Sequence, residues 1–175
     1  AMATMTMAEI RAAAPHVLVG GLGMGYTTRA VLDHLGPQGR VTVAELLPEV
    51  VRWNREHLGH LAGSPLDDPR VELVEDDVAR VMSAGPETFD AVMLDVDNGP
   101  AALTDVRNER LYRATGLAVV RRCLRPRGIL AVWSASPDRG FERALSAARF
   151  KVRVETVRAR PGAKGPKHTI FIAGT

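Results

Sequence analysis

Short apolar runs alternate with helical patterns along the chain from His16 to the last residues. The apolar runs predict strands over residues 17–20, 41–45, 71–74, 89–95 and 129–133. Helical spacing and capping signals predict helices over residues 26–35, 48–59, 109–124 and 141–148. This alternation is typical of an α/β fold with a mostly parallel sheet and helices on both of its faces.

The two ends of the chain carry weaker patterns. Residues 125–128 predict a turn into the strand at 129–133, and residues 151–157 and 169–173 predict a closing hairpin. We interpret residues 1–14 as the remnant of a tag followed by a short helix containing Ile10. Residues 15–175 are expected to form one domain, which the chain length of 175 residues fits.

Composition narrows the class of protein. Hydrophobic residues make up 46% and charged residues 25% of the chain, which is ordinary for a globular protein. The net charge of +3 permits contact with phosphates but is a weak argument for nucleic acid, and with only 5% of aromatic residues we expect no nucleic-acid partner. Cys123 is the only cysteine, which excludes an internal disulfide and favours a reducing, cytoplasmic compartment. No apolar run approaches the length of a membrane span, so we expect no membrane partner.

The strongest chemical signal is a glycine-rich turn between the first strand and its helix. Gly21, Gly23 and Gly25 alternate there with Leu22 and Met24. Bare backbone at these positions allows a ligand to approach closely, although a tight turn that needs glycine only for packing gives the same pattern. A dinucleotide fingerprint would require a third glycine where Tyr26 stands, so the spacing favours a compact ligand without phosphates over NAD.

Acidic residues follow three of the predicted strands. Glu45 ends the second strand about 20 residues after the glycines, where an acid accepts hydrogen bonds from ribose hydroxyls. Asp76 and Asp77 follow the third strand, and Asp77 could accept a proton of the adenine amino group. Each has a plain structural alternative, because Glu45 could cap the helix that begins at Pro48, and Asp76 or Asp77 could be a helix N-cap.

Asp95 ends the wholly apolar fourth strand. Without a partner an acid there would be costly to desolvate, and we expect it to deprotonate or orient a nucleophile as the catalytic residue. The alternative is a turn residue that bonds the backbone of Asn98 and Gly99. Roles for Asp97 and Asn98 stay open.

These segments together resemble class I S-adenosylmethionine-dependent transferases, and among them the spermidine-synthase-like branch. The resemblance rests on VLVGGLGMG, Glu45, EDDV, FDAVMLDVDNGP, Leu111-Tyr112 and RPRGILAVWS. It implies a Rossmann-like, doubly wound sheet of seven strands with a C-terminal antiparallel hairpin. It also implies cofactor-binding roles for the residues already singled out: Gly21, Gly23, Gly25, Glu45, Asp77 and Asp95.

The chain departs from the aminopropyltransferase pattern at three places. Met24 replaces the acid that holds the amine end of decarboxylated S-adenosylmethionine, and Asn98 replaces a second acid of the fourth-strand motif. Only about fifteen residues precede the first strand, so we also expect the branch's N-terminal β-domain to be lacking. These departures favour a methyltransferase that uses S-adenosylmethionine and acts on an unidentified small-molecule acceptor.

Two alternatives remain. One is a spermidine-synthase-like aminopropyltransferase that acts on a polyamine and uses the decarboxylated nucleoside. The other is a non-catalytic nucleoside-binding or scaffold protein. A homodimer is consistent with the resemblance.

Four other features do not indicate a functional site. His57 and His60 lack partners at metal-ligand spacing, so we expect no metal site. The basic run Arg158, Arg160, Lys164 and Lys167 fits a solvated hairpin loop. We expect Trp133 in the core more than in the substrate crevice, and Cys123 buried and inert.

Overall fold

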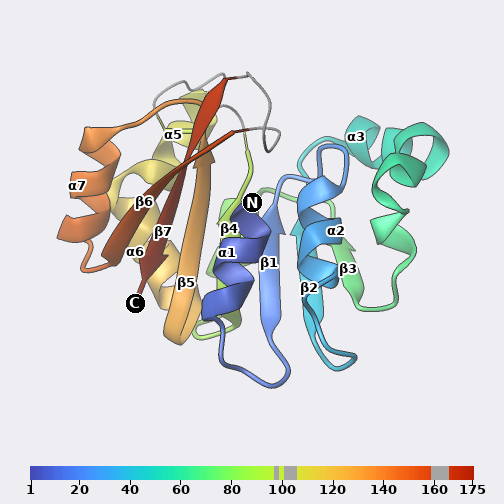
Figure 1. Ribbon diagram of the computed structural model, residues 1–175, viewed down its shortest axis with the longest axis horizontal. Coiled ribbons are helices and arrows are strands. Elements are labelled where there is room, and N and C mark those ends of the chain that lie inside the picture. Colours follow the sequence, from blue (N-terminus) through green and yellow to red (C-terminus); the bar gives the residue numbers. More distant parts are fainter. Residues whose placement is uncertain (97–98, 101–105, 159–165) are drawn as a thin grey trace.

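The computed structural model describes residues 1–96, 99–100, 106–158 and 166–175. A seven-stranded sheet runs through the molecule in the order β3-β2-β1-β4-β5-β7-β6 (Figure 1). The strands are β1 His16–Gly20, β2 Arg40–Ala44, β3 Val71–Val74, β4 Phe89–Leu94, β5 Leu124–Ser134, β6 Lys151–Arg158 and β7 Lys167–Gly174. The first five strands pair in parallel, and β7 pairs antiparallel with both β5 and β6. This confirms the predicted fold class, including the hairpin.

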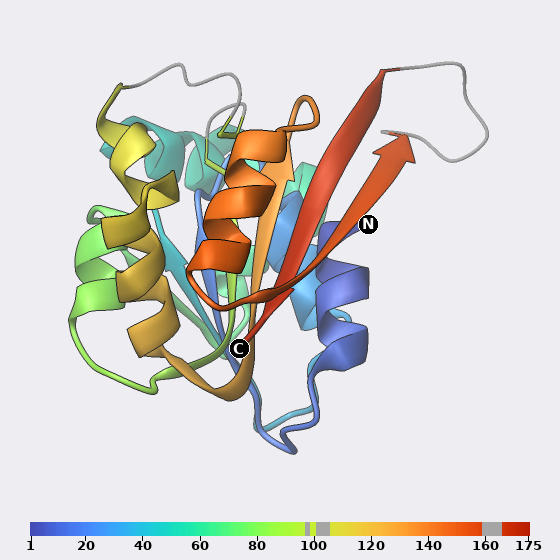
Figure 2. The ribbon, with the colours of Figure 1, turned by 90° about the vertical axis from the view of Figure 1, so that its left-hand side faces the viewer.

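Helices cover both faces of the sheet and bury its central strands on both sides. The α-helices are α1 Met2–Glu9, α2 Tyr26–Leu32, α3 Pro48–Trp53, α4 Val78–Ser83, α5 Val106–Tyr112, α6 Ala114–Cys123 and α7 Arg139–Ala147. In Figure 2, α1 lies on the opposite side of the sheet from α6. One core cluster packs α1, α2 and α3 on the sheet, and the other packs α4, α6 and α7.

The N-terminal segment forms a helix that packs on the core. The helix α1 ends at Glu9, one residue before Ile10. Met2 and Ala3 are buried in the same cluster as Val17 and Val31. Residues 2–9 therefore stabilise the sheet instead of trailing from it.

The predicted helix over residues 109–124 is wrong, because two helices replace it. Arg113 between them has an extended backbone with φ −83° and ψ 167°. A Cβ atom on Gly116 would lie only 2.2 Å from the carbonyl oxygen of Arg110, so glycine permits the close approach of α6 to α5. Because of this break, α5 is a separate helix from α6, and Arg110 lies near the C-terminal end of α5.

Two other predicted boundaries shift. The turn predicted at residues 125–128 lies inside the long strand β5, where Arg127 has a positive φ of 66° and the pairing with β4 shifts register. The helix predicted from Pro48 to Gly59 stops being α-helical at Trp53 and continues as a π-helical turn, Asn54–Leu58. Short 3-10 turns follow at Gly59–Ala62 and Pro65–Asp67. Such π-turns are frequent at functional sites.

Candidate active site

The carboxyl ends of the parallel strands gather the acidic residues and the glycine loop at one edge of the sheet, the upper edge in Figure 1. A cavity of about 290 Å³ opens there. The predicted site residues that line it are Gly21, Gly23, Glu45, Asp76, Asp77 and Asp95. The structure therefore brings together five of the six predicted cofactor-binding residues and places the sixth, Gly25, elsewhere.

The three glycines of the loop serve different purposes. All three have positive φ values, of 90°, 50° and 81° in chain order. A Cβ on Gly21 would lie 2.7 Å from the backbone oxygen of Asp95, and one on Gly25 would lie 2.8 Å from Pro65. A Cβ on Gly23 would meet nothing within 4 Å. Gly25 thus serves packing, whereas Gly23 leaves open space that a ligand can use.

Glu45 lies just after β2 and is 8% exposed. Its Oε2 atom accepts the backbone N–H of Leu22 at 2.9 Å, and its Oε1 atom accepts that of Leu47 at 3.0 Å. The carboxylate therefore joins the glycine loop to the loop after β2. Each oxygen keeps a second lone pair that can accept a hydrogen bond from a sugar hydroxyl.

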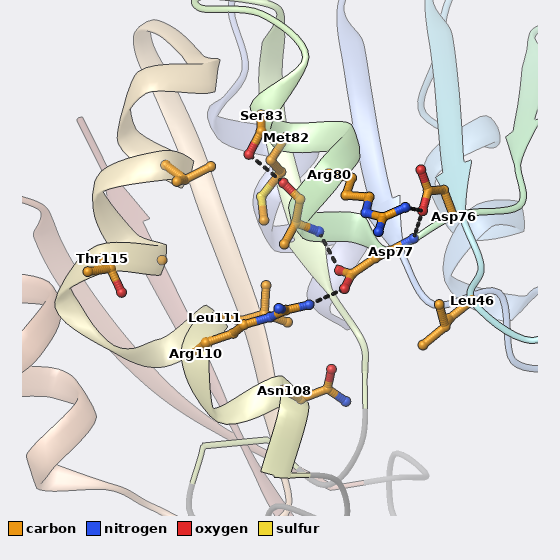
Figure 3. Close-up of a pocket in the computed structure, with 13 residues that line it drawn as sticks. Leu46, Asp76, Asp77, Arg80, Met82, Ser83, Asn108, Arg110, Leu111 and Thr115 are labelled. Atoms are coloured by element: carbon orange, nitrogen blue, oxygen red, sulfur yellow. Dashed lines mark hydrogen bonds and ion pairs between the residues drawn. The ribbon is translucent and has the colours of Figure 1, made fainter.

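Asp77 has the structural role that the sequence left open, and its side chain also lines the cavity. It is the N-cap of α4, where its Oδ1 atom accepts the backbone N–H of Ala79 at 2.8 Å. Its Oδ2 atom forms an ion pair with Arg110 of α5 (Figure 3). Asp76 in turn accepts the backbone N–H of Asp77 at 2.7 Å. Capping fixes the carboxylate of Asp77 at the rim of the cavity.

Asp95 is exposed, so burial does not impose the desolvation cost expected from its apolar strand. Its backbone N–H donates to the oxygen of Gly20 at 3.0 Å, and its Oδ2 atom accepts the hydroxyl of Thr27 at 2.6 Å. The other carboxylate oxygen has no hydrogen-bond partner among the described residues. Asn98, to which the alternative contact was expected, and Asp97 lie outside the described residues.

Sequence reasoning missed three residues that hold the site in shape. Thr27, in the first turn of α2, orients Asp95. Asn54, which is 4% exposed, donates from Nδ2 to the carbonyl oxygen of Gly23 at 2.6 Å and so pins the glycine loop. A polar residue on the buried face of a predicted helix is a signal that could have identified Asn54. Arg110 had no local signal, since it meets Asp77 from 33 residues away.

The remaining candidates stay outside the site. Trp133 stacks on His168 with a centroid distance of 4.9 Å and packs on a core cluster. His57 and His60 are exposed, and no metal-binding group of His, Cys, Asp or Glu occurs in the described part of the chain. Arg160 and Lys164 of the basic run lie outside the described residues. No described helix is long and apolar enough to cross a membrane.

Comparison with known proteins decides the family. The model of the spermine/spermidine synthase domain matches residues 2–147. The chain belongs to this family. Polyamine aminopropyltransferase 2 of Pseudomonas aeruginosa is 36% identical over 120 residues, which are 66% of this chain and 32% of that protein. The domain described here thus spans about a third of that relative.

Solved structures show the same fold. The spermidine synthase of Thermotoga maritima superposes with a TM-score of 0.76 at 20% identity, over 99% of this chain and 57% of that one. A precorrin-6y C5,15-methyltransferase from Geobacter metallireducens gives a TM-score of 0.69 at 18% identity, over 99% of this chain and 88% of that one. The synthase-type domain thus has a fold that occurs in transferases of both kinds.

Proposed function

We propose that the protein is an aminopropyltransferase that uses decarboxylated S-adenosylmethionine and an amine acceptor of the polyamine class. Curated relatives that are 32–37% identical are named polyamine aminopropyltransferases. These names favour the aminopropyl alternative over the methyltransferase expected from the sequence. Since the fold is shared with methyltransferases, the distinction must come from the site.

The charge of the cavity is the observation that carries the proposal. Four carboxylates line it, those of Glu45, Asp76, Asp77 and Asp95, and its described lining contains no lysine, arginine or histidine. Asp76 and Asp77 are ion-paired with Arg80 and Arg110 of the adjoining cavity, whereas Glu45 and Asp95 have no ion-pair partner among the described residues. The negative charge of Glu45 and Asp95 would disfavour the carboxylate of S-adenosylmethionine. The decarboxylated form carries only cationic groups besides its nucleoside, and these suit an acidic cavity.

The glycine loop and Glu45 fit the nucleoside part of that substrate. Gly23 leaves room for the sugar or the atoms attached to it, and the oxygens of Glu45 can accept from ribose hydroxyls. Asp77 lies at the same rim and can accept from the amino group of adenine. The bound nucleoside would supply an electrophilic carbon beside a sulfonium and a thioether leaving group.

Asp95 is the residue that we assign to proton transfer. An attacking amine must lose a proton as its nitrogen forms the new bond to carbon, and a carboxylate oxygen within hydrogen-bond reach can accept it. Thr27 holds one oxygen of Asp95, which fixes the direction in which the other points. Asp95 would thus act as a general base at the mouth of the cavity, next to the glycine loop.

The test is turnover with decarboxylated S-adenosylmethionine and a panel of diamines and polyamines, with methylthioadenosine measured by mass spectrometry. We expect product in the wild type and a fall in kcat of about 100-fold or more in Asp95→Asn, as for loss of a general base. Thr27→Val should lower kcat less and leave KM for the nucleoside nearly unchanged. Glu142→Gln, an exposed acid on α7, is the control.

One observation favours methyl transfer as a second candidate. Met24 in the glycine loop is 42% exposed, and its thioether cannot hold an ammonium group as an acid would. The same assay with S-adenosylmethionine and S-adenosylhomocysteine as readout separates the two. Methyl transfer without any methylthioadenosine would overturn the proposal.

A further inference from the structure

A second cavity continues the acidic one past Asp77. It measures about 540 Å³ and shares Leu46, Asp76, Asp77 and Asn108 with the first cavity. Its apolar floor includes Met82 of α4 and Leu111 of α5 (Figure 3). The floor suits a flat, weakly polar ring, and the boundary between the two cavities is the place where a purine edge would meet polar groups.

Asp77 and Arg110 form that boundary. Figure 3 shows the side chain of Arg110 reaching from α5 to the Oδ2 atom of Asp77. The opposite oxygen of the carboxylate is held by the N–H of Ala79, so Asp77 cannot turn away without uncapping α4. Arg110 is 60% exposed, and its guanidinium has five donors, of which the ion pair occupies only some.

The pair therefore presents a hydrogen-bond acceptor directly beside a donor. Adenine presents the complementary arrangement along one edge, with the 6-amino group as donor and ring nitrogen N1 as acceptor. We propose that Arg110 is a base-recognising residue, which donates to N1 of the adenine while Asp77 accepts from the 6-amino group. The inference rests on the proposed nucleoside site but is independent of which group the enzyme transfers.

This arrangement makes Arg110 more than a partner of Asp77. If Arg110 only oriented the carboxylate, its removal would weaken every adenine nucleoside equally. If it donates to N1, its removal would weaken only those nucleosides that carry N1. A ligand without this nitrogen separates the two cases.

The experiment is calorimetric binding of 5′-methylthioadenosine, its 1-deaza analogue and its 7-deaza analogue. Wild type should bind the 1-deaza analogue about five- to tenfold more weakly than methylthioadenosine, the range for one partly exposed charged hydrogen bond. Arg110→Met should bind both with the same affinity, at the level of the wild type with the 1-deaza analogue. Arg113→Met is the control, because Arg113 is also an ion-paired arginine but lies outside this cavity. This variant should retain the wild-type preference for methylthioadenosine over the 1-deaza analogue. The 7-deaza analogue keeps N1, so Arg110→Met should weaken its binding by the same factor as that of methylthioadenosine.

Several outcomes would overturn the inference. Equal weakening of all three ligands in Arg110→Met would make Arg110 a positioning residue only, and tighter binding of all three would make it an obstruction of the base site. No binding of methylthioadenosine to wild type would overturn both this inference and the proposed function. Binding with the expected preference but no turnover on any amine would overturn the proposed function alone. Melting curves of each variant establish that it is folded.

Discussion

The substitution Gly23→Ala separates ligand binding from folding at the glycine loop. Gly23 is exposed and has φ +50°, and a Cβ there would meet no atom within 4 Å. The methyl group would therefore fit the protein but occupy space at the wall of the 290 Å³ cavity. We expect a small loss of stability and a large loss of nucleoside affinity.

The loss of stability and the loss of nucleoside affinity in Gly23→Ala have different physical causes. A left-handed backbone costs a non-glycine residue about 1–2 kcal/mol, and the reduced entropy of the unfolded chain returns about 0.4–1 kcal/mol. The net cost of about 1 kcal/mol corresponds to a fall in Tm of roughly 2–4 °C for a chain of this size. With the nucleoside bound as proposed, the methyl group would force it away from the loop and from Glu45, and loss of a single hydrogen bond there would cost about tenfold in affinity.

Gly63→Ala is the matched control. Gly63 has φ +68°, and its Cβ would meet only the side chain of Arg29 at 3.6 Å, away from the cavity. Thermal melting and calorimetry with 5′-methylthioadenosine should show equal losses of Tm in the two variants but weaker binding only in Gly23→Ala. Unchanged affinity in Gly23→Ala would refute the assignment of this loop to the ligand.

Three further predictions concern individual groups. Glu45→Gln should lower the free energy of unfolding by about 1–3 kcal/mol, measured by urea denaturation, because one of its two backbone donors loses a carboxylate acceptor. Hydrogen bonding to Arg70 lowers the pKa of Asp68 to about 2. The stabilisation by this pair should therefore be complete above about pH 4 and lost as the pH falls towards 2. Asp68→Asn should remove this pH dependence of the free energy of unfolding between about pH 4 and 2. Burial raises the pKa of the Cys123 thiol to about 12, so iodoacetamide at pH 8 should label it only in urea; rapid labelling of the native protein would contradict its burial.

The fold was predictable because its determinants are local. Each buried strand is a short apolar run bounded by glycine, proline or charged residues, and each strand was found within a few residues of its expected position. The exceptions arose where a tertiary contact overrode local propensity. The apolar spacing of residues 109–124 is helical throughout, but the backbone is extended at Arg113, and Gly116 permits α6 to pack closely against the backbone of α5.

The site residues that follow from local pattern could be predicted, and those that depend on tertiary contacts could not. Gly21, Gly23, Glu45, Asp77 and Asp95 could be predicted from their places at strand ends, which converge in any parallel sheet of this order. The residues that orient them could not be predicted. The contact of Thr27 with Asp95 spans 68 residues and that of Arg110 with Asp77 spans 33, and nothing in the local pattern identifies either pair.

The structure also changes what a substitution at these acids can show. The sequence posed capping and ligand binding as alternatives for Glu45 and Asp77, yet both carboxylates already accept backbone N–H groups and still line the cavity. Their removal would disturb the loops as well as the ligand, so a loss of activity there cannot be assigned to either cause. Gly23 lines the 290 Å³ cavity and Arg110 lines the adjoining 540 Å³ cavity, and neither residue uses a side chain to accept backbone N–H groups. Substitution at these two positions therefore tests the site more directly than substitution of the acids that first revealed it.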